Sequence, residues 1–427
     1  MSATADLLAF AGASHHLPEA VRADAERLLA DTLAVGAAGA KAPGADAILS
    51  AARSMGSGDE ARLLGTAERL AGPSAAFVNG YRIHCLEWDA VHEPAVVHAL
   101  STVVAALGAA IDRRGGCDPD EALAALAGGV DGAAGLGLAA DSALTFFRPA
   151  TAGVIGAALA VARIDSAPLD DTLGLACASA AGTMQAHVEG LATLPFQIAN
   201  AARAAVTASD LARAGFPGPK DPLEGAFGYF RLFDQGDLSR YTRELGQVWR
   251  ISEVSVKPYP SGRASHAMIG AILNPGIRAD EIEALEMFVP PLVHRLIGRP
   301  FQPDMTPAYA RLCGPLLAAL ALRDGVIDPR AFTPATFADP ALAALAGRIA
   351  IRIDDNTDPN ALSPQRMLVH HAAGHLDLEI PHTLGSPESP LSPAQAQAKR
   401  ALARDLAPAD ADPRLFDAPL AYFTDGR

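Results

Sequence analysis

The chain has 427 residues, enough to bury a large core and to divide into two domains. Half of the residues are apolar but only 5% are aromatic, so alanine, leucine and valine supply most of the core. The formal net charge of −14 argues against nucleic acids and anionic membranes as partners. The four cysteines lie far apart without a CxxC pair, which excludes a recognisable iron–sulfur or zinc-ribbon pattern and suits a reducing cytosol.

The N-terminal sequence MSATADLL lacks the basic region of a signal peptide. The longest apolar stretches, such as residues 150–162, are too short and too rich in glycine to span a bilayer. We therefore expect a soluble, cytoplasmic protein.

Helical periodicity dominates the first 250 residues. Apolar residues recur there at three-to-four spacing in six segments, separated by glycine, proline or aspartate: 19–38, 73–85, 100–112, 119–135, 151–163 and 169–191. Because no strand pattern interrupts these segments, the sequence predicts an all-helical domain over residues 1–254.

The pattern changes after residue 251. Apolar and polar residues alternate, as in half-buried strands, in three segments: 285–289, 349–353 and 376–380. The last of them follows a plausible hairpin turn at 373–374. These segments predict a small sheet.

Helical patterns lie between and after the predicted strands, at residues 307–323 and 394–406. The sequence therefore predicts a mainly α fold with a large all-helical domain. A smaller α+β lid domain is expected over residues 255–392, and residues 393–427 are expected to return to the helical domain.

Residues 84–98, with the sequence HCLEWDAVHEPAVVH, concentrate titratable side chains in a chain that is only 19% charged. Histidines beside carboxylates are what proton-transfer chemistry uses. A surface loop is the plainer interpretation, but loops seldom carry a tryptophan between two acids. A divalent metal is a less favoured alternative, with four candidate ligands: Glu87, Asp89, His92 and His98.

A second polar segment, residues 257–266, has the sequence KPYPSGRASH. Its two prolines force an extended path, and a helix is predicted from residue 264. Lys257 and Arg263 would then lie near a helix N-terminus, where a pair of cations can bind a carboxylate or phosphate. The alternative is a proline-rich linker with solvated charges.

Arg148 precedes another predicted helix and could also bind an anion, although a surface arginine is equally consistent with its position. His370, His371 and His375 flank the predicted hairpin turn, so a metal site there is disfavoured. The sequence contains no GxGxxG after a strand, no GxSxG and no Walker motif.

These segments resemble the MmgE/PrpD family, which includes 2-methylcitrate dehydratases, cis-aconitate decarboxylases and an iminodisuccinate epimerase. Residues 75–93, AAFVNGYRIHCLEWDAVHE, are similar to the family's AAFxNGxxxHxLDFDDVHE stretch, and residues 257–266 to its KPYPxCxxxH signature. Residues 222–225 and 385–392 match further family landmarks. The resemblance covers most of the chain.

The resemblance implies a homodimeric enzyme without a cofactor, with its site in the cleft between a helical domain and an α+β lid. By matching position, Glu87 and Asp89 stand in the family's acidic motif. His98 stands at a proposed proton-transfer histidine, and Lys257 and His266 stand in the lid-side signature.

The chain also departs from the family pattern. Arg148 replaces a histidine of the HPTG motif, Leu194 replaces the lysine of the TKP motif, and Ala90 replaces an acid. Leu316 stands at or near the place of a common tyrosine. These changes predict weak or absent turnover of cis-aconitate and 2-methylcitrate.

We therefore expect a cofactor-independent lyase, of the dehydratase or decarboxylase type, that moves a proton next to a carboxylate of a small acid. His98 would be the general base or acid, with His266 as its counterpart on the lid, and Asp89 and Glu87 would orient a neighbouring histidine or raise its pKa. The substrate-binding candidates are Lys257, Arg263, Arg148 and His92, and no metal is expected. The alternatives are an epimerase or isomerase of a small dicarboxylate and a non-catalytic carboxylate-binding protein.

Overall fold

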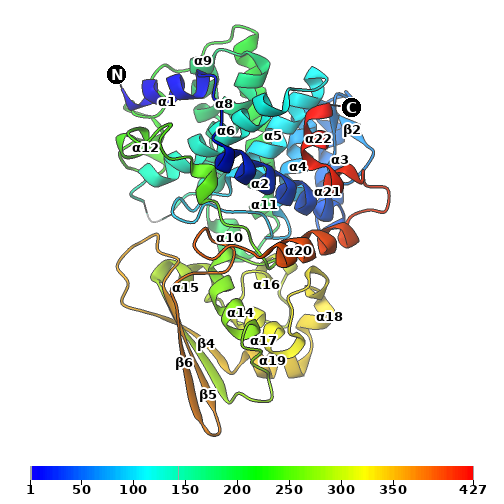
Figure 1. The fold of residues 1–427 in the computed structure, drawn as a ribbon, viewed down its shortest axis with the longest axis vertical. Coiled ribbons are helices and arrows are strands. Elements are labelled where there is room, and N and C mark those ends of the chain that lie inside the picture. The colour runs from blue at the N-terminus through cyan, green and yellow to red at the C-terminus, as the bar shows by residue number, and fades with distance from the viewer. Residues whose placement is uncertain (1, 143, 427) are drawn as a thin grey trace.

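Two regions make up the structure, a helical body and a smaller unit that contains a sheet (Figure 1). It is a computed structural model that describes residues 2–142 and 144–426. The longer helices of the body are α1 (Ala3–Gly12), α2 (Glu19–Ala38), α3 (Ala45–Ser54), α4 (Gly72–His84), α5 (Ala99–Arg114), α6 (Pro119–Ala139), α8 (Gly153–Asp165), α9 (Leu169–Ala178) and α11 (Thr193–Arg213).

Short helices and one short strand pair complete the body. They are η1 (Gly39–Lys41), β1 (Ala61–Arg62), β2 (Arg69–Leu70), α7 (Arg148–Thr151), α10 (Gln185–Glu189), α12 (Tyr229–Leu232), α13 (Ser239–Thr242) and η2 (Arg250–Glu253). The two-residue strands β1 and β2 pair antiparallel, a feature that the sequence did not predict.

Small residues let the central helices of the body approach closely. A Cβ on Gly156 of α8 would lie 2.2 Å from the carbonyl oxygen of Gly129 in α6, so neither helix could carry a larger residue there without moving. Helix α6 is long and apolar enough to cross a membrane, but 89% of its apolar window is buried inside the body. It is one of the buried helices of this core.

The predicted helices are largely confirmed. Helix α2 has the predicted bounds, and α5 and α6 contain the predicted segments. The predicted helix 169–191 instead breaks into α9 and α10, with Gly182 at a φ of 132° between them. Helix α11 was not among the predicted segments, although it buries one face that includes Ile198, Ala202 and Val206.

The lid consists of a four-stranded sheet and short helices. Its elements are η3 (Arg263–Ser265), α14 (His266–Leu273), β3 (Ala284–Val289), α15 (Pro291–Ile297), α16 (Pro307–Ala310), α17 (Gly314–Asp324), η4 (Pro329–Ala331), α18 (Pro334–Phe337), α19 (Pro340–Ala346), β4 (Ile349–Ile353), β5 (Gln365–His371) and β6 (Gly374–Ile380).

The strand order is β4-β3-β5-β6, and β5 and β6 form the predicted hairpin. Strand β3 pairs parallel with β4 and antiparallel with β5. The predicted helix 307–323 is divided at residues 311–313, because the sequence Gly314-Pro315 starts a new helix. This break matters for the site, since Arg311 lies in it.

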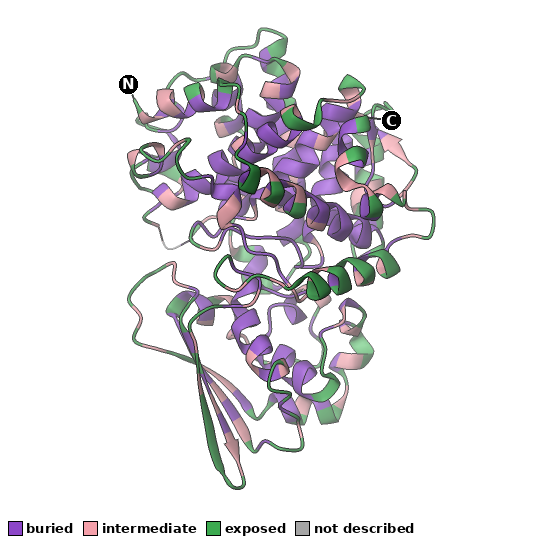
Figure 2. Cartoon of the chain, viewed as in Figure 1, coloured by how far each residue is buried: buried purple, intermediate pink, exposed green. Residues whose placement is uncertain are grey.

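Each region has its own buried core (Figure 2). The C-terminal helices α20 (Pro393–Leu406), α21 (Arg414–Asp417) and α22 (Pro419–Asp425) pack on the body, chiefly against α2. The ammonium of Lys399 in α20 lies 2.7 Å from the carboxylate of Asp31 in α2. The end of the chain thus belongs structurally to the helical body.

Candidate active site

The loop between α4 and α5 supplies most of the polar cluster. His84 is the last residue of α4, and His98 immediately precedes α5, so both histidines are held by helix ends. Val91 exchanges two backbone hydrogen bonds with Ser255, of 3.0 and 2.9 Å. This short ladder brings Lys257, two residues further along, to the loop.

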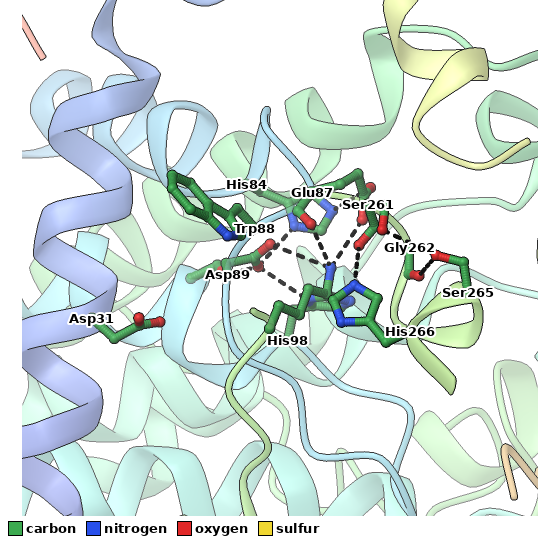
Figure 3. A network of polar contacts seen from close by, with 12 residues as sticks. Asp31, His84, Glu87, Trp88, Asp89, His98, Ser261, Gly262, Ser265 and His266 are labelled. Carbon is green, nitrogen blue, oxygen red and sulfur yellow. Dashed lines mark hydrogen bonds and ion pairs between the residues drawn. The ribbon is translucent and has the colours of Figure 1, made fainter. Parts of the chain in front are cut away.

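Asp89 is the centre of the cluster (Figure 3). Its Oδ2 accepts a hydrogen bond from the Nδ1 of His84 and one from the Nδ1 of His98, each 2.9 Å long. The hydroxyl of Ser101 donates to the same oxygen. Because an ionised carboxylate can only accept, both histidines carry a proton on Nδ1 and turn Nε2 away from Asp89.

Lys257 bridges the two acids of the loop. Its ammonium lies 3.1 Å from a carboxylate oxygen of Glu87 and 3.8 Å from Oδ1 of Asp89, and it is fully buried. Glu87 Oε1 in turn lies 3.7 Å from His84 Nε2. The cluster therefore places positive and negative groups next to one another in a buried site.

The cluster shifts the pKa values of its members. Burial alone would raise the pKa of Asp89, but His84, His98 and Lys257 outweigh burial and hold it well below 3.8. In the same way Lys257 and the histidines overcome burial and lower the pKa of Glu87 to about 2. Both acids are thus ionised at neutral pH.

The two histidines titrate differently. Burial lowers the pKa of His98, and the nearby charges of Lys257 and His84 lower it further. Asp89 raises it but does not outweigh them, so the pKa of His98 lies below 6.5. For His84, Asp89 and Glu87 overcome burial and raise the pKa. His98 is therefore the neutral imidazole of the pair, with a free lone pair on Nε2.

Two neighbouring cavities adjoin this cluster at the boundary between body and lid, with volumes of about 260 and 70 Å³. Four residues line both: His84, Glu87, Leu194 and Leu312. His98 lines the smaller cavity, and its Nε2 has no hydrogen-bond partner among the described residues. A proton acceptor thus faces a space that a small molecule can enter.

The backbone around the smaller cavity is strained. Glu87, Val96 and Leu144 line it and have φ values of 52°, 53° and 55°. Side chains disfavour this left-handed region, most of all a β-branched one, at a cost of about 1–3 kcal/mol each. Such strain gathers at functional sites, where the surrounding structure holds it in place.

His266, the expected lid-side partner, lies next to the cluster (Figure 3). Its Nε2 donates to the carbonyl oxygen of Ser261 over 3.2 Å, and its buried Nδ1 has no partner among the described residues. Burial, with Arg263 and Lys257, lowers the pKa of His266 well below 6.5. The residues that line the two cavities do not include it.

The remaining candidates have protein partners instead of an open ligand site. Arg263 pairs with Glu93 at 2.8 Å and donates to the backbone carbonyls of residues 383 and 384, although it also lines the smaller cavity. His92 is fully buried, with Nε2 3.0 Å from Glu253.

Arg148 differs most from the sequence expectation. It is fully buried, pairs with Asp234 at 3.1 Å, and donates to the backbone oxygens of Ala95 and Ser142, so each guanidinium nitrogen has an acceptor. The physical reason is that Asp234, which lies 86 residues away in sequence, neutralises the charge that a substrate was expected to meet.

Three side chains could supply ligands to a metal ion, namely His84, Asp89 and His98, whose ligand atoms lie within 4.8 Å of one another. Both Nδ1 atoms are, however, at hydrogen-bond distance from a single oxygen of Asp89, and the ammonium of Lys257 already neutralises its other oxygen. His92, one of the expected ligands, turns toward Glu253 instead.

Sequence reasoning gave no role to His84, Ser101 or Arg311. His84 and Ser101 could have been found from spacing, because His84 ends the helix before Asp89 and Ser101 lies one turn after His98 on α5. Arg311 carried no such signal, since it lay inside a predicted continuous helix.

Comparison with known families agrees with these segments. The MmgE/PrpD N-terminal domain matches residues 9–241, and the MmgE/PrpD C-terminal domain matches residues 259–416. The chain belongs to the MmgE/PrpD family. The N-terminal match contains His84, Glu87, Asp89 and His98, whereas Lys257 lies between the two matches. The C-terminal match contains the elements of the lid together with α20.

Several relatives of known name are similar to the chain. A cis-aconitate decarboxylase-like protein of Aspergillus oryzae is 28% identical over 277 residues, 60% of this chain and 57% of that protein. A cis-aconitate decarboxylase of Aspergillus terreus is 28% identical over 61% of this chain and 57% of its own length. That of Mus musculus is 25% identical over 82% and 76%. The matched part thus spans less than two thirds of either fungal relative.

Proposed function

We propose that the protein is a cofactor-independent lyase, of the dehydratase or decarboxylase type, that acts on a small carboxylic acid. The observation that carries this proposal is the geometry of His98. Its Nδ1 is fixed by Asp89, and its Nε2 has no partner in the part of the chain that the structure describes, while the side chain lines the smaller cavity. The family membership and the names of the relatives support the same class of reaction.

In this proposal His98 Nε2 removes a proton from the carbon next to a carboxylate, or returns one to that carbon after carbon dioxide has left. Asp89 holds the imidazole in the required tautomer and stabilises the imidazolium that forms. Lys257 acts by keeping Glu87 and Asp89 charged and in place. Closure of the lid over the body would exclude water from the transfer.

The residues that line the cavities restrict which substrates can bind. Leu194, at the position of the family lysine, lines both cavities, so that wall offers an apolar surface. A carboxylate placed against it would lose water without gaining a partner. We therefore propose a substrate with fewer or differently placed carboxylates than cis-aconitate, and weak turnover of cis-aconitate and 2-methylcitrate.

The reaction class is tested by incubating the enzyme with a panel of small carboxylic acids in D₂O and following the products by NMR. A decarboxylase gives loss of carbon dioxide, with deuterium on the carbon that carried it, whereas a dehydratase gives loss of water without deuterium on the carbon that loses the proton. Exchange of the α-proton without elimination would favour an epimerase. Binding seen by thermal shift without any turnover would favour a non-catalytic protein.

Turnover is expected to survive dialysis against a strong chelator.

The acid limb of the pH–rate profile reports on His98. Where His98 acts as the base that removes a proton, it works only when neutral, so activity is present above its pKa and is lost as pH falls through that value. Because burial and neighbouring cations lower the pKa of His98, the limb in kcat/KM should lie below pH 6.5. A limb above 6.5, with folding checked by circular dichroism at each pH, would contradict this assignment.

The association state and the ligand remain expectations from the family. We propose a homodimer that takes a small carboxylate as its partner. Sedimentation at several protein concentrations would test the dimer, and a mass of about 44 kDa at all of them, that of a single chain, would exclude it.

A further inference from the structure

Arg311 is a buried arginine without an acidic partner. It is 4% exposed and lies in the break between α16 and α17. Its guanidinium lies 4.6 Å above the ring of Phe332, and Nη1 makes one long hydrogen bond of 3.4 Å to the carbonyl of Pro307. Across residues 2–142 and 144–426, Nε has no acceptor and no carboxylate lies within ion-pair distance of the guanidinium.

The cations that the sequence singled out contrast with Arg311. Lys257 is paired with Glu87, Arg263 with Glu93, and Arg148 with Asp234. Their charges are therefore neutralised by the protein itself. Buried charges in proteins are normally paired. Arg82 is likewise buried without an ion pair among the described residues, but it donates to the carbonyl oxygen of Leu64 over 2.6 Å and borders neither cavity. Arg311 is therefore an unpaired cation that a ligand can reach.

The surroundings of Arg311 point to that counterion. Arg311 lines the cavity of about 260 Å³, and among the described residues it is the one lysine or arginine that does so. Much of the remaining wall is apolar, including Leu191, Leu194 and Leu312. A guanidinium stays charged when buried and presents two parallel N–H groups to a carboxylate, so an anion in this cavity would be bound in the fork of Arg311.

The backbone fixes Arg311 relative to the reacting groups. Its carbonyl oxygen accepts a 3.0 Å hydrogen bond from the amide of Gly262, which belongs to the same segment, residues 257–266, as Lys257. Glu87 and His84 share the same cavity, and they also border the smaller cavity that His98 faces. A molecule that fills both cavities would have one end at Arg311 and the other at His98.

We propose that Arg311 binds a carboxylate of the substrate, and that the end of the substrate in the larger cavity carries this one carboxylate on otherwise apolar carbon. The site takes monocarboxylates or dicarboxylates in preference to tricarboxylates, because a second carboxylate in this cavity would meet Glu87 and leucine. The binding claim stands alone, but the orientation toward His98 rests on the proposed function.

The test uses Arg311→Met in the full-length enzyme, with butyrate, succinate and tricarballylate as probes and butyramide as the neutral analogue of butyrate. Removal of a buried charge that lacks a protein partner should leave the melting temperature of the ligand-free variant equal or higher. The increase in melting temperature caused by butyrate or succinate should disappear. KM for any turned-over acid should rise on the order of 100-fold, with a smaller change in kcat.

Arg330→Met is the matched control. Arg330 is a lid arginine on the surface, paired with Asp328 at 2.7 Å and Asp405 at 2.8 Å, and borders neither cavity. It should leave both KM and the carboxylate-induced stabilisation unchanged. Arg311→Lys keeps the charge without the fork and should recover part of the binding.

Three results would overturn the proposal. One is that Arg311→Met melts at a lower temperature yet binds carboxylates as the wild type does, which would make Arg311 a structural residue. Another is that no carboxylate of the panel stabilises the wild type even at high millimolar concentration, and the third is that tricarballylate binds best. If binding depends on Arg311 but His98→Gln leaves turnover unchanged, the proposed function fails and this inference stands.

Discussion

Replacement of His98 by glutamine is expected to lower kcat by on the order of 10²–10⁴-fold without a matching loss of stability. The glutamine amide can still donate to Asp89, so the hydrogen bond of 2.9 Å that holds the side chain has a substitute. What disappears is the unprotonated Nε2 that faces the cavity. Steady-state kinetics on the best substrate, with a thermal melt of each variant, measures both effects.

His92→Gln is the matched control for this prediction. His92 belongs to the same loop, but its Nε2 contacts Glu253 and its Nδ1 accepts the amide of Ala95 over 3.2 Å. Its replacement should lower the melting temperature and leave kcat of the folded enzyme nearly unchanged. If His92→Gln abolished turnover while His98→Gln did not, the two histidines would have to exchange roles.

The part of the site that sequence could predict is the part that is continuous in the chain. Residues 84–98 end one helix and begin the next, so their side chains are forced together by local geometry. The approach of Lys257 does not follow from local spacing along the chain. In the structure it depends on the pairing of Val91 with Ser255, which joins segments with no shared periodicity.

The choice of counterion could not be predicted in this way. A sequence shows that a residue is a cation, but not which distant acid will meet it after folding. Asp234 reaches Arg148 from 86 positions away, and Glu93 reaches Arg263 from 170. Arg311 is the opposite case, a cation to which the sequence assigned no role and which is left without an acidic partner among the described residues. It lies in a segment predicted as one helix, but in the structure that helix is broken beside the cavity.

Arg148→Met is expected to destabilise the fold by about 3–5 kcal/mol, because it leaves the buried carboxylate of Asp234 without its cation. The substitution would also disturb neighbouring contacts. Asp234 accepts a 2.7 Å hydrogen bond from Tyr229, and Arg148 donates to the backbone at Ala95, next to the strained residue Val96. Urea unfolding of wild type and variant measures the difference in the free energy of unfolding, provided that both show the same dependence on urea concentration.

A second substitution separates a structural role of Arg148 from the substrate-binding role expected from sequence. Replacement of Asp234 by leucine in the Arg148→Met background removes both charges, so the double variant should be more stable than either single variant. KM of the folded double variant should stay within a few fold of wild type, since neither residue lines the two cavities. A single variant of normal stability with a KM raised 100-fold would instead show that Arg148 leaves Asp234 to bind the substrate.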